Sequence, residues 1–200
     1  MPNPIEFYFD FSSPYAYFAA QKIDELGASF DRDVSWRPMM LGAALKETGS
    51  QPLANIPLKG DYCRRDWARL ARYQELPWTV PDPFPIAALA PTRGFYWLAD
   101  QDMAAAKAFA WACFSAYFGV GRNISDAAVV AEIAGECGLD SAAMAEALGE
   151  DAVKQRVKDE TAKAIENGVF GSPFFVIDGE PFWGADRLWM VRRWLKSGGW

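Results

Sequence analysis

The segment from residue 168 to residue 187, GVFGSPFFVIDGEPFWGADR, constrains the fold more than any other part of this 200-residue chain. The apolar run at 174–177 is typical of a short strand. It is followed by Asp178-Gly179, a pair that two-residue hairpin turns prefer. We therefore expect residues 180–183 to pair back antiparallel, which places a β-hairpin close to the C-terminus.

Two backbone features flank this hairpin. Pro173 can lie at a sheet edge because proline donates no ladder hydrogen bond, and a cis Ser172–Pro173 bond is allowed in such a turn. After the second strand, the sequence predicts a C-terminal helix that opens near Ala185 with Asp186 as its cap. An open strand end and a helix N-terminus can both hold a peptide-like anion.

The N-terminal 40 residues predict a strand–helix–strand unit. Residues 5–9 are apolar and aromatic, as in a buried strand. Ser13 is a natural N-cap and Pro14 a natural first helical residue, so a helix should run from there to about residue 26. A second strand is predicted at 34–39, and the connection between parallel strands should be right-handed.

The sequence between these two ends is helical in character. Residues 41–150 predict several short helices, and residues 151–167 a long charged one. Two strands cannot bury both faces of a sheet, so the outer units must combine. We predict an α/β fold with a four-stranded mixed sheet in residues 1–40 and 151–200, interrupted by an all-helical insertion domain at 41–150.

Composition excludes several classes of partner. The formal net charge of −6 argues against nucleic acid and anionic membranes. No apolar run approaches the 18 or so residues of a membrane span, and the first residues lack the pattern of a signal peptide. The three cysteines, Cys63, Cys113 and Cys137, form no C-x-x-C motif. These features predict a cytoplasmic protein whose thiols are small core residues.

Histidine is absent from the chain. This excludes Ser-His-Asp and Cys-His catalytic systems as well as histidine-based metal sites, and we predict no metal. Acid–base chemistry must then come from hydroxyls, carboxylates, lysine, cysteine or a bound cofactor.

Three motifs, FYFDFSSPYAY, GSPFF and FWGADRL, carry a resemblance that spans essentially the whole chain. The order of elements resembles a thioredoxin-like fold with a helical insertion. The motifs themselves resemble the 2-hydroxychromene-2-carboxylate isomerases and the kappa-class glutathione transferases. Thioredoxin-like redox proteins carry cysteine at the start of the first helix, where this chain has Ser12-Ser13. The resemblance implies that bound glutathione supplies the thiol.

The resemblance also implies site residues at the two ends of the chain. Ser13 matches the serine that faces the sulfur, and it is the predicted catalytic residue. Ser172 and Pro173 match the turn whose backbone pairs with the glutathione cysteine. Ala185 and Asp186 match the positions that hold the γ-glutamyl end. Each also has a plainer explanation: Ser13 and Asp186 as helix caps, and Ser172 as part of an ordinary turn.

The helical insertion contributes further candidates. Asn55 and Lys59 resemble a pair that meets the glycyl carboxylate, although they can equally be a solvated loop and helix start. Arg93 resembles an arginine near the second substrate, or is a surface charge. Tyr15 is a candidate for an aromatic substrate pocket, although most aromatic side chains are core. Related sequences often carry a polar residue near the position of Ala87, which is apolar here.

The predicted function is that of a glutathione-dependent isomerase acting on an aromatic-derived, conjugated electrophile. The alternatives are a kappa-type glutathione transferase or peroxidase and a non-catalytic glutathione-binding protein. The family habit, together with aromatic residues such as Trp97, Trp111 and Phe118 in the insertion, also predicts a homodimer.

Overall fold

The computed structural model describes residues 3–200 and contains the predicted four-stranded mixed sheet. Its order is β2-β1-β3-β4, with β1 parallel to β2 and antiparallel to β3, and with β3 antiparallel to β4. The strands are β1 (Ile5–Phe9), β2 (Val34–Pro38), β3 (Phe174–Ile177) and β4 (Glu180–Trp183). The predicted hairpin is confirmed, and the Ser172–Pro173 peptide bond before it is cis.

Residues 3–200 contain the predicted helices, and the ones predicted from residue 14 to about residue 26 and at 151–167 lie within about two residues of their expected bounds. The helices are α1 (Pro14–Ala28), α2 (Leu41–Glu47), α3 (Lys59–Gln74), α4 (Leu89–Ala99), α5 (Met103–Phe114), α6 (Ala127–Glu136), α7 (Ser141–Ala147), α8 (Asp151–Glu166) and α9 (Leu188–Ser197). Three short helical segments join them: η1 (Leu53–Asn55) in the predicted loop, a π-helical turn η2 (Ser115–Gly119) that continues α5, and η3 (Ala185–Arg187) before α9. No helix in residues 3–200 combines the length and apolarity that a membrane crossing requires.

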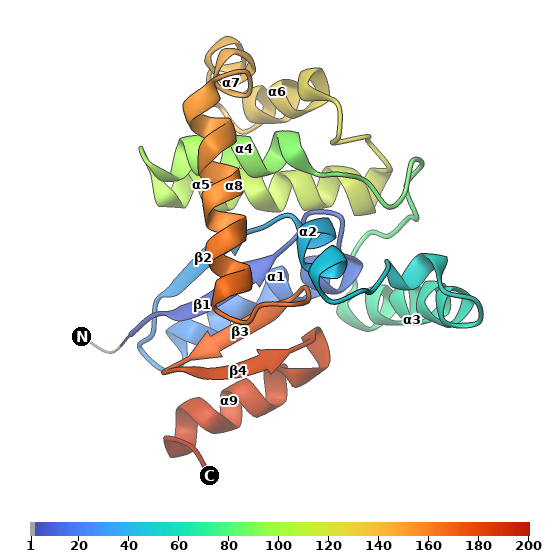
Figure 1. The fold of residues 1–200 in the computed structure, drawn as a ribbon, viewed down its shortest axis with the longest axis vertical. Helices are drawn as coiled ribbons and strands as arrows, with labels where there is room; N and C mark the ends of the chain where they lie inside the picture. The colour runs from blue at the N-terminus through green and yellow to red at the C-terminus, as the bar shows by residue number, and fades with distance from the viewer. Residues whose placement is uncertain (1–2) are drawn as a thin grey trace.

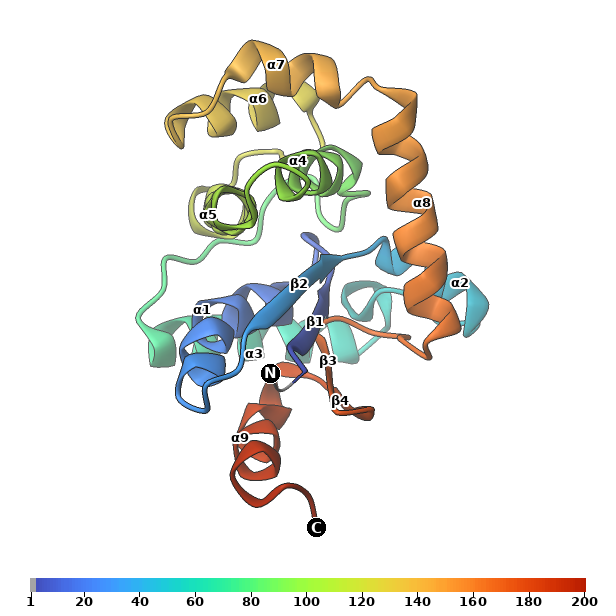
Figure 2. The ribbon, with the colours of Figure 1, turned by 90° about the vertical axis from the view of Figure 1, so that its left-hand side faces the viewer.

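Helices α4 to α7 of the insertion are stacked on one side of the sheet, whereas α3 of the insertion packs against α1. Figure 1 shows α4 and α5 above the strands, with α6 and α7 beyond them. Figure 2 shows α8 descending from this block past the sheet, whereas α9 covers the opposite end of the molecule. Because α8 packs against α4 and then leads into β3, it ties the insertion to the sheet.

An aromatic core joins the sheet to the insertion. The ring of Phe9, on β1, lies 5.5 Å from that of Phe114 and 6.2 Å from that of Phe95, centroid to centroid. Phe11 packs on Phe114 at 5.0 Å, and all four side chains are fully buried. Each such pair contributes about 0.5–1.5 kcal/mol beyond its buried area. The division into a thioredoxin-like domain and a helical insertion domain stays a prediction. One hydrophobic core contains residues of both parts.

Burial corrects two expectations about individual side chains. Phe118 is completely buried and stacks on Trp78 with ring centroids 5.5 Å apart, so it cannot contribute to a dimer interface. Trp97 and Trp111 are half-buried. Cys137 is exposed, contrary to its prediction as a core residue, whereas Cys63 and Cys113 are buried. The homodimer stays a prediction. The burial of these aromatic side chains leaves less exposed aromatic surface to support it than the sequence indicates.

Candidate active site

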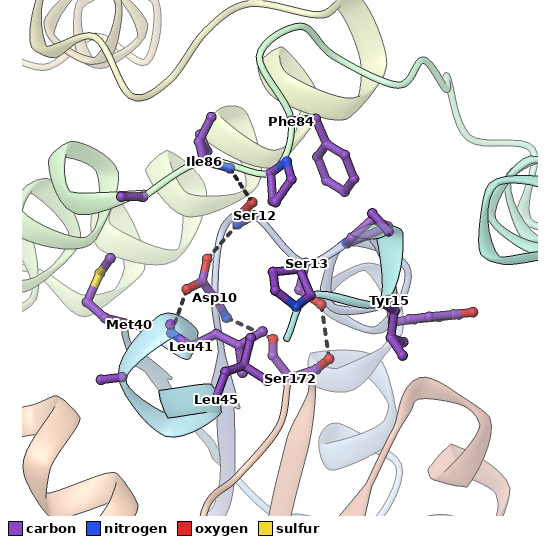
Figure 3. Close-up of a pocket in the computed structure, with 18 of the residues that line it drawn as sticks. Asp10, Ser12, Ser13, Tyr15, Met40, Leu41, Leu45, Phe84, Ile86 and Ser172 are labelled. Atoms are coloured by element: carbon purple, nitrogen blue, oxygen red, sulfur yellow. Dashed lines mark hydrogen bonds between the residues drawn. The ribbon is translucent and has the colours of Figure 1, made fainter. Parts of the chain in front are cut away.

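A cavity of about 340 Å³ opens where the C-terminal end of β1 meets the N-terminus of α1. Its wall is completed by α2, η1, Trp67 of α3, the loop at 84–87 and Ser172. Figure 3 shows these segments converging on Asp10, Ser12, Ser13 and Ser172 from parts of the chain that are far apart in sequence.

Asp10 holds together the polar side of this cavity (Figure 3). One carboxylate oxygen, Oδ1, accepts a hydrogen bond from Ser12 N at 2.7 Å, and the other, Oδ2, accepts one from Leu41 N at 2.7 Å. The Asp10 backbone N–H donates to Ser172 Oγ at 2.9 Å. A single residue at the end of β1 therefore fixes the loop before α1, the start of α2 and the turn before β3.

The carboxyl group of Asp10 is unusual because it is buried in a cavity wall. Asp10 is only 3% exposed, and burial raises the pKa of its carboxyl group from 3.8 to about 6. The hydrogen bonds from Ser12 N and Leu41 N act in the opposite direction and favour the ionised form. The group therefore titrates close to neutral pH, as acid–base groups do in active sites.

Ser13 performs the capping role that its position predicts, and it also contacts Ser172. Its Oγ accepts a hydrogen bond from Ala16 N at 3.3 Å and donates to the carbonyl oxygen of Ser172 at 3.0 Å. Ser13 is 5% exposed and lines the cavity. The two serines predicted from opposite ends of the chain are thus in direct contact.

Two backbone N–H groups at this point have no hydrogen-bond partner within residues 3–200. They belong to Tyr15, in the first turn of α1, and to Ser172, before the cis proline. Both residues line the cavity. A helix N-terminus carries a partial positive charge and unsatisfied donors, so this edge of the cavity is suited to an anionic or peptide-like ligand.

The remaining cavity wall is apolar. Leu41 and Leu45 of α2 lie on one side, and Phe84 and Ile86 of the loop before α4 lie on another. The loop is held by a hydrogen bond from Ile86 N to Ser12 Oγ at 3.0 Å. A ligand in this space would therefore contact polar groups at the β1–α1 junction and hydrocarbon elsewhere.

Tyr15 is the predicted substrate-binding residue that does line the cavity. Its hydroxyl donates to Asp66 Oδ2 at 3.0 Å, which orients it toward α3, and burial together with Asp66 raises the pKa of the phenol. The ring, rather than the hydroxyl, is the part suited to contact a ligand. Asn55 and Lys59 are exposed and lie beside the wall, where the neighbouring Ala54 contributes instead.

The Ala185–Asp186 turn lies next to Pro173 without lining the cavity in residues 3–200. Gly184 N donates to the carbonyl oxygen of Pro173 at 3.0 Å, which fixes the turn beside the cis proline. The prediction that Asp186 caps a helix is wrong. Its carboxylate instead accepts a hydrogen bond from Arg187 Nη1 at 2.7 Å, because the chain forms η3 before α9 begins.

Arg93 lies away from this cavity. Its Nη1 donates to the carbonyl oxygen of Leu148, at the end of α7, at 3.2 Å, and its guanidinium is half-buried between α4 and α7. This is a packing contact inside the insertion. A substrate-binding role for Arg93 stays a prediction that the cavity does not support.

Asp10 and Ser12 belong to the site and are absent from the residues predicted from sequence. The available signal was an acidic residue directly after an apolar strand and three residues before a helix cap, a place where polar side chains meet at the end of a sheet. The sequence pattern does not reveal the hydrogen bond from Leu41 N to Asp10, because that contact depends on where α2 packs.

Comparison with known proteins places this chain in a family. Residues 4–196 match the model of the DsbA-like thioredoxin domain. A 2-hydroxychromene-2-carboxylate isomerase from Sphingobium xenophagum is 30% identical over 201 residues, covering 98% of this chain and 99% of the relative. The glutathione S-transferase kappa 2 of Caenorhabditis elegans is 25% identical, covering 98% and 94% of the two chains.

A solved structure agrees with these sequence relationships. A 2-hydroxychromene-2-carboxylate isomerase superposes with a TM-score of 0.87 at 27% identity, covering 96% of this chain and 94% of the other. The chain therefore belongs to the DsbA-like thioredoxin domain family, as a homologue of the 2-hydroxychromene-2-carboxylate isomerases.

Proposed function

We propose that this protein is a glutathione-dependent isomerase of an aromatic-derived, conjugated carboxylate. The observation that carries the proposal is the Ser13–Ser172 contact at the N-terminus of α1. Within residues 3–200, the backbone N–H groups of Tyr15 and Ser172 have no partner there, and no cysteine lines the cavity. The isomerases and kappa-class transferases among its relatives support enzymatic chemistry on a small molecule.

The residues present fit glutathione as the partner in this cavity. The backbone of Ser172 can pair with the cysteinyl residue of the tripeptide as an added strand, using its free N–H. The predicted contacts for the two ends of glutathione are the Ala185–Asp186 turn for the γ-glutamyl group and Asn55 with Lys59 for the glycyl carboxylate. The Ser13 hydroxyl, now donating to Ser172 O, can turn toward a sulfur atom placed at the helix N-terminus.

When bound, glutathione supplies a thiolate that can add reversibly to a conjugated double bond and leave unchanged. The protein's part is to stabilise the anionic sulfur and to shield the reaction from water. The N-terminus of α1 carries about half a positive charge, and a hydroxyl donor adds a charge-assisted hydrogen bond. The apolar wall of Leu45, Phe84 and Ile86 suits a flat, largely hydrocarbon substrate.

A kappa-type transferase or peroxidase is the second candidate. The observation that favours it is the apolar character of residues 84–87, since no polar side chain of that loop is available to orient a carboxylate. A glutathione-binding protein without catalysis would show affinity and no turnover. We also retain the homodimer and the cytoplasmic location as proposals. A monomeric mass by light scattering at micromolar concentration would rule out the dimer.

The function can be tested by following glutathione itself. Reduced glutathione at about 100 times its Kd should stabilise the protein by about 2.7 kcal/mol, visible as a thermal shift. With a panel of conjugated aromatic carboxylates, an isomerase leaves the free thiol concentration constant while the substrate spectrum changes. A transferase lowers the thiol concentration in step with product. No thermal shift at millimolar glutathione would contradict both.

A further inference from the structure

The carboxylate of Asp10 has no cationic partner in residues 3–200, although it is almost completely buried. Burial of an unpaired charge is costly, so a protein that retains one needs a reason for it. Asp10 lines the cavity, and its two hydrogen bonds from Ser12 N and Leu41 N satisfy one lone pair on each oxygen. A carboxylate has about four acceptor positions, so the remaining ones are available to a ligand.

Other titratable groups around the cavity are poorly suited to exchange a proton near neutral pH. The pKa of Tyr15 is raised mainly by burial and further by the neighbouring carboxylate of Asp66, a residue of α3 that accepts a hydrogen bond from the Tyr15 hydroxyl. Burial also raises the pKa of Tyr117 on η2. The negative charge of Asp10 raises this pKa further, whereas a hydrogen bond with Ser12 lowers it. The Tyr117 hydroxyl donates to Pro83 O at 2.8 Å. The chain has no histidine, and within residues 3–200 Asp10 is the one carboxyl group that lines the cavity.

We infer that Asp10 is the acid–base group of this site, which accepts the proton of a thiol bound at the N-terminus of α1 and later returns it. The inference rests on the proposed function, and it assigns a catalytic residue to it. Ser12 and Leu41 hold the carboxylate toward the cavity, and the Asp10 backbone positions Ser172.

The proton balance of the step is simple. The S–H bond breaks, an O–H bond forms on Asp10, and the electron pair of the S–H bond stays on sulfur. After the thiolate has added to the conjugated system, the proton on Asp10 moves to the substrate position that gains negative charge. Elimination reverses both transfers, so that neither oxidant nor reductant is needed.

The test is a pH titration of glutathione labelled with ¹³C at the cysteinyl β-carbon, observed by NMR in its complex with the protein. In the wild type, the β-carbon should titrate in two steps between pH 4.5 and 9, one as Asp10 ionises and the other as the thiol ionises. Asp10→Asn should abolish the Asp10 step and lower the midpoint of the thiol step, because a neighbouring negative charge has been removed.

Asp66→Asn is the matched control, because it makes the same change at a carboxylate that contacts Tyr15 outside the cavity wall. It should keep both steps. A single-step titration in the wild type, or two steps in Asp10→Asn, would overturn the inference. Absence of any shift of the labelled carbon on adding protein would instead contradict the proposed function.

A second measurement needs no substitution, in case Asp10→Asn does not fold. With aspartate labelled by ¹³C at the carboxyl carbon, the protein alone should show one carboxyl titrating near pH 6. Binding of glutathione should move that midpoint. A midpoint near pH 6 that is identical with and without saturating glutathione would show that Asp10 faces no ligand, and the inference would fail.

Discussion

The Ser13–Ser172 pair and the Ala185–Asp186 turn lie in very different surroundings, although both are predicted to bind the same ligand. Ser13 is buried in a cavity wall, and its hydroxyl has partners on both sides. Asp186 is exposed, and its carboxylate is held by the adjacent Arg187. Beside them, Gly184 N donates a hydrogen bond to the carbonyl oxygen of Pro173, which joins the turn to the segment that carries Ser172.

The difference indicates where specificity and chemistry reside. A hydrogen bond made in a buried, low-dielectric wall is strong and fixed in direction, whereas an exposed ion pair contributes about 0–1 kcal/mol. We therefore expect the buried side to control the reactivity of the ligand and the exposed turn to add affinity. Substitutions on the two sides separate these contributions.

The largest effect concerns stability on the buried side. The pKa of Asp10 is raised to about 6 in the folded protein, above its value of 3.8. The stability linked to this group is therefore fully present below about pH 4 and is lost as the pH rises through about 6. The free energy of unfolding of the wild type, relative to Asp10→Asn, should fall by about 3 kcal/mol between pH 3 and 8. Urea titrations at several pH values measure this, and parallel profiles would contradict it.

The second effect concerns access to the cavity. Gly42, in the first turn of α2, lines the cavity, and a Cβ atom placed there meets no atom within 4 Å. Gly42→Trp should fill the opening of the cavity at little cost to the stability of the fold. It should weaken glutathione binding about a hundredfold, which corresponds to a loss of about 2.7 kcal/mol of binding free energy. Calorimetric titration measures the affinity.

Ala128→Trp is the matched control for this cavity block, because it also introduces tryptophan at the exposed second residue of a helix, α6. Its affinity should equal that of the wild type. If Gly42→Trp binds as tightly as Ala128→Trp, the ligand lies outside the cavity, and the surface around Asp186 becomes the alternative.

The smallest effect concerns the exposed turn. Asp186→Ala should weaken glutathione binding about tenfold, as expected for one charge-assisted hydrogen bond to the γ-glutamyl ammonium. Since Asp186 makes no cap and pairs only with exposed Arg187, the free energy of unfolding should change by less than about 0.5 kcal/mol. An unchanged affinity would confine the binding site to the buried side.

The parts of the fold that follow from local patterns could be predicted. The hairpin at 174–183 is encoded by an apolar run and an Asp-Gly turn, and the cap of α1 by Ser13 before Pro14. The family motifs assigned Ser13 and Ser172 to one ligand without predicting their direct contact, which arises because the sheet places β3 beside β1.

The parts that depend on tertiary placement could not be predicted. Asp10 reads as an ordinary acidic residue after a strand until the start of α2 supplies Leu41 N as a partner. Asp186 reads as a cap until the chain inserts η3 ahead of α9. Phe118 belongs to an apolar segment in which composition does not distinguish buried from exposed faces, and here it is completely buried.

We propose that the Ser13 hydroxyl stabilises a thiolate at the N-terminus of α1. Ser13→Gly tests it because glycine caps a helix within a few tenths of a kcal/mol of serine and has no hydroxyl. The measurement is thiolate absorbance of the glutathione complex against pH. We predict that the pKa of the bound thiol rises by about 1–2 units, with turnover at neutral pH reduced ten- to a hundredfold. An unchanged thiol pKa in a folded, glutathione-binding Ser13→Gly protein would contradict the claim and leave Ser13 as a helix cap alone.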